Sequence, residues 1–282
     1  MILLTETVVA VKIDYAFRNH IGLLRPRNED AWYTGLGGSA HEDGVFAVAD
    51  GMGGHPGGEV ASALAIAAVA DGRDLPREPA PPERLLRIFR AASEKIRERG
   101  RHEPQHRDMG TTLTVALLDH GLAWIGHIGD CRLYWIRGGE EVQITRDHTM
   151  AQDLIEAGLL HPSMADNHPS SHVLTRCLGA CPDQGPDLLL SPLALAAGDR
   201  LLLASDGLVK AVRAAALPEL LQGRDPEAGV EQLISAALEG GAPDNVTVVL
   251  LSLVGSADPA GETAGGVGVE FESVNALRWT RG

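Results

Sequence analysis

Aromatic residues are scarce in this sequence, because phenylalanine, tyrosine and tryptophan together make up 4% of its 282 residues. Hydrophobic residues still reach 44%, so a core must be built from leucine, valine, isoleucine and alanine. Secondary structure must therefore be read from aliphatic periodicity. No run approaches the roughly 20 apolar residues of a membrane-spanning helix. We expect a globular chain that one large sandwich of sheets and helices can use whole.

Cysteine and positive charge are also in short supply. Cys131, Cys177 and Cys181 are too few, and odd in number, for a secreted disulfide framework, and no signal peptide is evident, so we expect a cytoplasmic protein. The sequence has 24 Lys and Arg against 38 Asp and Glu, for a net charge of −14. Such a surface repels nucleic acids and anionic membranes. We expect neither as a partner, and we expect a monomer.

Short apolar runs and amphipathic stretches predict alternating strands and helices. Strands are expected at residues 45–49, 112–118, 122–128, 132–136, 201–204 and 246–254. Helices are expected at residues 59–69, 83–99, 150–157 and 226–239. Residues 159–172 are polar and indicate a surface loop. The last residues, 255–282, are rich in Gly and Ala at first and predict a flexible tail, with docking of the more apolar end as the alternative.

Three aspartates share one local pattern. Asp50, Asp206 and Asp244 each stand at the edge of an apolar strand and are followed by Gly or Asn, residues that end strands. Acids at converging strand ends repel one another unless cations lie between them. Ligands that are all oxygen favour Mg²⁺ or Mn²⁺. Any one of these residues alone would be read as a turn aspartate, but the three together predict a metal site.

Eight segments in this order resemble the bacterial branch of the protein phosphatase 2C family, the metal-dependent PPM phosphatases. They are RPRNEDA (25–31), VADGMGGHPGGEVAS (48–62), GTTLTVALL (110–118), HIGDCRLY (127–134), RDHTMAQDLIEAG (146–158), LTRCLG (174–179), LLASDGL (202–208) and APDNVTVVLL (242–251). The resemblance implies an α+β fold: a four-layer α-β-β-α sandwich of two antiparallel sheets flanked by helices. Residues 1–254 would form this catalytic domain.

The resemblance also implies a ligand set around two divalent ions, Mn²⁺ or Mg²⁺, with a third and weaker ion in bacterial members. Asp50 matches the aspartate that bridges the two ions, and Gly51 matches a carbonyl ligand. Arg25 matches the arginine that grips the substrate phosphate. The remaining matched ligands are Asp206 and Asp244 on the first ion, Glu29 and Asp30 through bound water, and Asp130 with Asp206 on the third ion.

The implied activity is hydrolysis of phosphoserine and phosphothreonine on proteins, opposing a bacterial Ser/Thr kinase or acting on its targets. A phosphate monoester is a dianion that resists hydroxide, and a pair of divalent ions both acidifies water and offsets phosphoryl charge. Arg25 can add a bidentate clamp that lysine cannot mimic. No side-chain nucleophile is needed, so Cys131 receives no catalytic role.

The proton donor to the leaving group is less defined. Met52 stands where eukaryotic relatives have a histidine. His55, in the same glycine-rich loop, is our candidate for proton transfer or water orientation. Two alternatives stay open: His55 only packs or caps the following helix, or a bound water donates the proton.

Two further motifs are set aside. His102 and His106 fit the H-E-x-x-H zinc-protease pattern, but Pro104 between them disrupts the helix that would align them. Cys177 and Cys181 are interpreted as unlinked residues of a turn, with a soft-metal site or a disulfide as the alternative. Two other functions also remain open: a non-catalytic scaffold with this fold, and a phosphohydrolase acting on small phosphate esters.

Overall fold

The structure is a computed structural model and describes residues 11–37, 43–52, 57–73, 80–165, 168–181, 185–255 and 279–281. The strands are β1 (Val11–His20), β2 (Asp30–Gly37), β3 (Asp43–Asp50), β4 (Gly110–Thr111), β5 (Leu113–Asp119), β6 (Leu122–Ile128), β7 (Arg132–Arg137), β8 (Glu140–Gln143), β9 (Leu178–Gly179), β10 (Asp187–Leu189), β11 (Leu193–Ala194), β12 (Arg200–Ala204), β13 (Val246–Gly255) and β14 (Trp279–Arg281). The α-helices are α1 (Gly58–Arg73), α2 (Pro81–His102), α3 (Met150–Glu156), α4 (Asp206–Ala211), α5 (Leu217–Leu221) and α6 (Pro226–Glu239).

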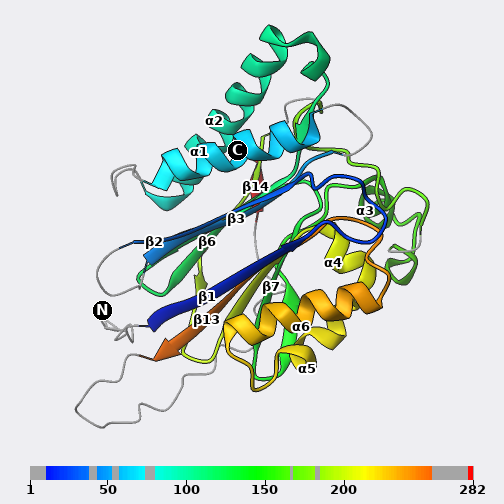
Figure 1. Cartoon of the computed structure of the whole chain (residues 1–282). Coiled ribbons are helices and arrows are strands. Elements are labelled where there is room, and N and C mark those ends of the chain that lie inside the picture. Colours follow the sequence, from blue (N-terminus) through cyan, green and yellow to red (C-terminus); the bar gives the residue numbers. More distant parts are fainter. Residues whose placement is uncertain are drawn as a thin grey trace.

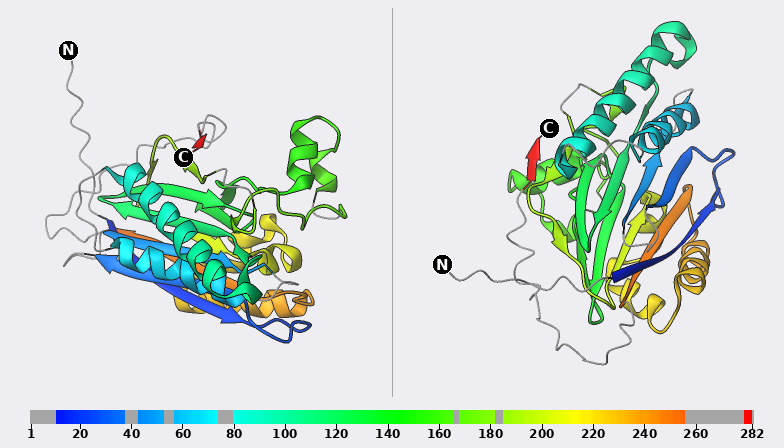
Figure 2. Two further views of the ribbon diagram at one scale, coloured as in Figure 1. Left: turned by 90° about the horizontal axis from the view of Figure 1, so that it is seen from above. Right: turned by 90° about the vertical axis from the view of Figure 1, so that its left-hand side faces the viewer.

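Two antiparallel sheets face each other (Figure 1). One has the strand order β1-β13-β12-β7-β8, and the other has the order β14-β10-β6-β5-β3-β2, with β11 also paired to β6. Helices α1 and α2 cover the outer face of the second sheet, and α4, α5 and α6 cover the outer face of the first. Figure 2 shows the same four layers from two other sides. The predicted α-β-β-α sandwich is confirmed.

Strand residues alternate between two cores because successive side chains point to opposite faces of a sheet. In β3, Phe46 and Val48 lie in the core between the sheets, whereas Val45 and Ala47 pack under α1 and α2. A strand buried on both faces has no polar side, which explains why the run from 45 to 49 is continuously apolar. Each outer helix layer packs on its sheet through a face rich in small or aliphatic residues, such as Ala61 in α1.

The predicted strands and helices are all present, with ends shifted by a few residues. The expected flexible tail at 255–282 needs a correction at its end, because Trp279–Arg281 form β14, which pairs with β10. Trp279 packs against the core between the sheets, so the docking alternative holds for these three residues. Among the described residues, no helix is both long enough and apolar enough to cross a membrane.

Candidate metal centre

The acids that the sequence places at strand ends lie at one edge of the sandwich. β2 begins at Asp30 and β3 ends at Asp50, and these two residues are directly paired in the antiparallel ladder. In the facing sheet, β12 ends before Ser205 and Asp206, and Asp244 precedes the start of β13. β12 and β13 are antiparallel neighbours, so the end of one strand lies beside the beginning of the other.

Asp30 connects the two sheets at this edge. Its Oδ2 accepts hydrogen bonds from the Ser205 hydroxyl at 2.8 Å and the Thr247 hydroxyl at 2.6 Å. Its Oδ1 is buried, and no described residue donates a hydrogen bond to it. Burial raises the pKa of Asp30 to about 7, although the two hydroxyl groups act against the shift. A buried carboxylate oxygen without a donor is a favourable contact for a cation.

The backbone of Asp50 and Gly51 is fixed by its neighbours. The Asp50 N–H donates to Thr112 Oγ1 at 2.9 Å, and the Thr111 hydroxyl donates to the Asp50 carbonyl at 2.8 Å. A Cβ added to Gly51 would lie 2.3 Å from the carbonyl oxygen of Gly58. Only glycine therefore fits at position 51, and the two threonines, which were not among the predicted site residues, hold the peptide that follows β3.

Glu29 and Arg25 stand beside this peptide. The Glu29 carbonyl accepts the Gly51 N–H at 3.1 Å, and its carboxylate lies 3.8 Å from Arg25 Nη1. Burial and the nearby Glu59 raise the pKa of Glu29. Arg25 donates through Nη2 to Asp244 Oδ2 at 2.8 Å, and its side chain remains 36% exposed. The predicted phosphate-binding arginine is thus at the acid edge and accessible from solvent.

Lys210 is a site residue that the sequence analysis missed. It lies one helical turn after Asp206 in α4, and its Nζ is 2.5 Å from Asp206 Oδ2 and 2.9 Å from Asp244 Oδ2. Burial acts against its charge, but the two carboxylates outweigh burial and raise its pKa. Burial also disfavours the charge of Asp244, yet Lys210, the Asn245 N–H and Arg25 lower the pKa of Asp244 overall.

Asp130, the predicted ligand of a third ion, follows β6 at the same edge. It is 8% exposed, and burial and the charge of Asp206 raise its pKa well above the ordinary range. Gly129 before it has φ +109°, and a Cβ there would lie 2.4 Å from the Thr112 side chain. Glycine is therefore required for the turn that aims Asp130 into the site.

A buried network that the sequence analysis also missed supports this turn. The Gly129 N–H donates to His148 Nδ1 at 3.0 Å, and the His148 N–H donates to the Gly129 carbonyl at 2.7 Å. Because Nδ1 accepts, the ring proton is on Nε2, which donates to Asp187 Oδ2 at 3.1 Å. Arg176 donates to Asp187 Oδ1 at 2.8 Å. Burial raises the pKa of Asp187, but His148 and Arg176 lower it overall.

Electrostatic repulsion within the acid cluster is concentrated on Asp50. Burial raises its pKa well above the ordinary range, and four neighbouring carboxylates raise it further. These neighbours are Asp30, Asp206, Asp130 and Asp244. Asp206 Oδ1 is, like Asp30 Oδ1, buried without a hydrogen-bond partner among the described residues. Buried acids that repel one another and leave oxygens unpartnered fit divalent ions, and an all-oxygen ligand set fits Mg²⁺ or Mn²⁺.

The other sequence predictions have mixed outcomes. His55 lies outside the described residues, so its role stays a prediction. The zinc-protease pattern is split, since α2 ends at His102 and a separate turn of 3-10 helix spans Pro104–His106. The interpretation of Cys177 and Cys181 as unlinked is wrong. They form a disulfide with the Cα atoms 5.2 Å apart. The backbone bends after the short strand β9, where Gly179 has φ +91°.

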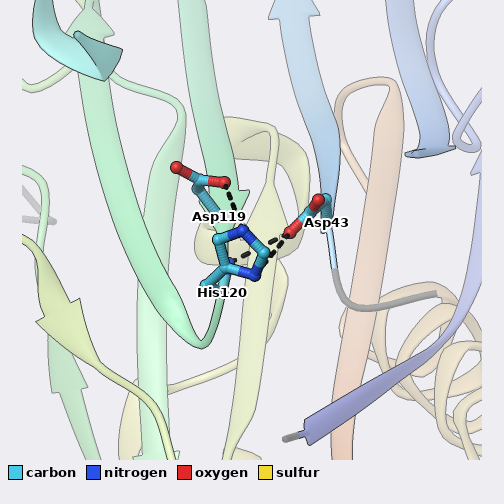
Figure 3. Close-up of side chains that lie close together, drawn as sticks. All are labelled: Asp43, Asp119 and His120. Atoms are coloured by element: carbon cyan, nitrogen blue, oxygen red, sulfur yellow. Dashed lines mark hydrogen bonds and ion pairs between the residues drawn. The ribbon is translucent and has the colours of Figure 1, made fainter. Parts of the chain in front are cut away.

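A second acidic group lies at the other end of β3 (Figure 3). Asp43 is the first residue of β3, and it meets Asp119 and His120 at the β5–β6 hairpin. His120 and Gly121 both have positive φ, +49° and +74°, as a two-residue hairpin turn requires. The His120 N–H donates to Asp43 Oδ1 at 3.0 Å. This hydrogen bond links the β5–β6 hairpin to β3 and explains why Asp43, Asp119 and His120 lie close together.

The fold and this acid edge define a class of protein: a metal-binding α-β-β-α sandwich with an arginine beside the carboxylates. Residues 25–227 match the family described as Protein phosphatase 2C. The serine/threonine protein phosphatase PstP of Mycobacterium tuberculosis is 40% identical over 248 residues, which are 87% of this chain and 46% of that protein. The chain belongs to the protein phosphatase 2C family, and the predicted family is confirmed.

A second curated relative and a solved structure are also similar to this chain. Protein phosphatase PhpP of Streptococcus pneumoniae is 35% identical over 215 residues, which are 74% of this chain and 85% of that protein. The crystal structure of the catalytic domain of PstP, in complex with two manganese ions, superimposes with a TM-score of 0.73 at 37% identity and covers 86% of this chain and 99% of that one. The chain spans about half the length of PstP itself.

Proposed function

We propose that this chain is a metal-dependent protein phosphatase that hydrolyses phosphoserine and phosphothreonine. The observation that carries the proposal is the edge at which Asp30 and Asp206 each keep a buried carboxylate oxygen without a donor among the described residues. Two divalent ions, Mn²⁺ or Mg²⁺, are proposed to be held by Asp50, the Gly51 carbonyl, Asp206 and Asp244. Glu29 and Asp30 hold bound water, and Asp130 with Asp206 is the proposed place of a weaker third ion. The manganese ions in the PstP catalytic domain support this assignment.

The residues of the chain have separable tasks in this proposal. When bound, the ions supply Lewis-acid chemistry that acidifies water and offsets phosphoryl charge. Ser205 and Thr247 hold Asp30 through its Oδ2, and Oδ1 keeps no donor among the described residues. Arg25 is 36% exposed and already at the acid edge, where its planar guanidinium is suited to bidentate contact with a phosphate dianion.

We propose a phosphoprotein of a bacterial Ser/Thr kinase pathway as substrate, either the kinase or its targets. The relatives PstP and PhpP are protein phosphatases, which supports a protein substrate. The flap from His148 to His172 begins beside the turn that carries Asp130, because the His148 N–H donates to the Gly129 carbonyl at 2.7 Å. This flap is the proposed determinant of substrate choice. The cytoplasmic location, the monomeric state and the role of His55 stay predictions.

The experiment compares Mn²⁺-dependent turnover of a phosphothreonine peptide, p-nitrophenyl phosphate and a panel of small phosphate esters. We expect peptide turnover that EDTA abolishes and that Asp50→Asn and Asp206→Asn each reduce by orders of magnitude. Asp14→Asn, an exposed acid on β1, is the matched control and should have wild-type rates. Full activity in EDTA or in Asp50→Asn would exclude the mechanism, and a strong preference for a small ester would exclude the protein substrate.

A further inference from the structure

Lys210 contacts two of the carboxylates proposed to hold metal, and the contacts use particular oxygens. Its Nζ lies 2.5 Å from Asp206 Oδ2 and 2.9 Å from Asp244 Oδ2. The side chain is 34% exposed, against 17% for Asp206 and 12% for Asp244. The Lys210 side chain is therefore more accessible to solvent than either carboxylate that it contacts.

The two carboxylates differ in how many oxygens remain for another cation. Asp206 Oδ1 is buried and has no partner among the described residues. Asp244 Oδ1 accepts the Asn245 N–H at 2.9 Å, and Asp244 Oδ2 accepts from both Arg25 and Lys210. Groups of the chain itself thus fill both acceptor sites of Asp244 Oδ2 and one of the two on Oδ1. A metal ion that takes Oδ2 as its ligand must displace Arg25 or Lys210, and an ion on Oδ1 must share a carboxylate that already pairs with both cations.

Lys210 is the cation that competes most directly with a metal ion, because it contacts both Asp206 and Asp244. Arg25 has Glu29 as its second carboxylate, at 3.8 Å, and the Asn245 N–H belongs to the backbone that enters β13. Lys210 is attached to the site through a flexible side chain on the short helix α4. An ammonium group and a divalent ion on the same carboxylate also repel each other strongly in a partly buried site.

We propose that Lys210 is an internal counter-cation that competes with metal for Asp206 and Asp244 and so weakens the metal position built on Asp244. Before metal binds, Lys210 positions the two carboxylates and offsets their repulsion. When metal binds, Lys210 moves off Asp244 toward solvent. This inference deepens the proposed function and rests on it, because it concerns the same metal centre.

The test is Mn²⁺ binding to the full chain, measured by calorimetry on metal-free protein. Lys210→Gln removes the charge while keeping a polar side chain, and we expect it to bind Mn²⁺ about tenfold more tightly than wild type, since one unit charge near the site is removed. Lys210→Arg keeps the charge and should bind like wild type. Lys95→Gln makes the same change in net charge on α2, where Lys95 pairs with Asp71 at 3.0 Å, and should also bind like wild type.

Thermal unfolding gives a second readout that a purely structural role would not produce. Lys210→Gln should lower the Tm in EDTA, because the carboxylates lose their counter-cation, and should show a larger Mn²⁺-induced rise in Tm than wild type. A structural defect would lower the Tm in both conditions and leave the Mn²⁺-induced rise unchanged. Lys210→Met serves if Lys210→Gln folds poorly, since it removes the same charge with an apolar side chain.

The outcomes separate this inference from the proposed function. Equal Mn²⁺ affinity in wild type and Lys210→Gln, or equal tightening in Lys95→Gln, overturns the role of Lys210 and leaves the phosphatase assignment standing. The expected tightening without turnover of any phosphopeptide supports the role of Lys210 and overturns the phosphatase assignment. Failure of wild type and all variants to bind Mn²⁺ overturns both.

Discussion

Two buried groups of charged side chains lie beside the turn that carries Asp130. In one group each acid has a basic partner, and in the other the acids mainly face one another. In the first group, Asp187 faces Arg176 and His148, and these partners lower its pKa. In the second group, the acid cluster, burial and mutual repulsion raise the pKa of Asp50. Both groups are close to the same backbone, because His148 bonds both the N–H and the carbonyl of Gly129.

This difference distinguishes a structural network, whose charges are paired within the chain, from a site whose charges need a bound metal ion. A buried charge is tolerated when it is paired and hydrogen-bonded, which is the situation of Asp187. Carboxylates left to repel one another destabilise the fold, and such perturbed acids gather at functional sites. The first group should therefore behave alike with and without metal, whereas the second should not.

The largest expected effect comes from Asp50→Asn. Turnover with Mn²⁺ should fall by orders of magnitude, because the carboxylate proposed to contact both ions is lost. The same change removes a repelling charge, so we expect the Tm measured in EDTA to rise. Asp187→Asn is the counterpart in the structural network and should lower the Tm in EDTA and in Mn²⁺ alike. A lower metal-free Tm for Asp50→Asn would contradict the distinction between the two groups.

Next in size is the loss of Arg176, which is 5% exposed. Arg176→Met leaves Asp187 buried without its guanidinium partner, and we expect a loss of about 3–5 kcal/mol in the free energy of unfolding. Chemical denaturation with and without Mn²⁺ should give the same loss. Arg146→Met removes an exposed ion pair with Glu156 and should cost less than about 1 kcal/mol. Equal losses in the two variants would show that the network contributes little.

The pH dependence of stability should distinguish the acid cluster from the network. Asp30 has its pKa raised to about 7 in the folded chain, against about 4 when unfolded. Metal-free wild type should therefore lose stability relative to Asp30→Asn as the pH rises from about 4 to 7, and the difference should be constant above pH 7. The comparison cancels the titration of His127 and His148, which are present in both proteins.

Denaturation in EDTA at several pH values measures this difference. Saturating Mn²⁺ should reverse its sign at neutral pH, because the metal favours the charged carboxylate. Asp187 cannot cause a stability change between pH 4 and 7. Its pKa is lowered in the folded chain, so its contribution to stability is constant above about pH 4 and is lost only below that pH. A difference that does not change between pH 4 and 7 would show that Asp30 is not perturbed.

Local sequence is enough to predict some of these residues but not others. Asp50 ends the apolar strand β3, and Asp206 lies two residues after the last residue of the apolar strand β12, so their place at a sheet edge is a local property. Lys210 meets Asp244 only after α4 and β13 are brought together, and His148 meets Asp187 only through a loop. The strands β10 and β14 are too short to show an alternating apolar pattern, and each forms by pairing with a neighbouring strand.

The smallest effect predicted concerns β14, where the sequence favoured a flexible tail. Trp279 pairs with Leu189 in β10 and packs against the core between the sheets while remaining partly exposed. Trp279→Ala should therefore reduce the free energy of unfolding by about 1–2 kcal/mol, less than a fully buried aromatic would. Leu190→Ala, at a side chain that is 50% exposed, is the control and should change stability little.

Because β10 also carries Asp187, the same experiment sharpens the comparison between the two charged groups. If β14 supports β10, the loss in Trp279→Ala and the loss in Arg176→Met should be coupled in the double variant rather than additive. Asp50→Asn, whose residue lies on β3, should be additive with Trp279→Ala. Denaturation of the three single and two double variants measures both couplings. Coupling of Trp279 to Asp50 but not to Arg176 would mean that β14 supports the acid cluster instead of the network behind it.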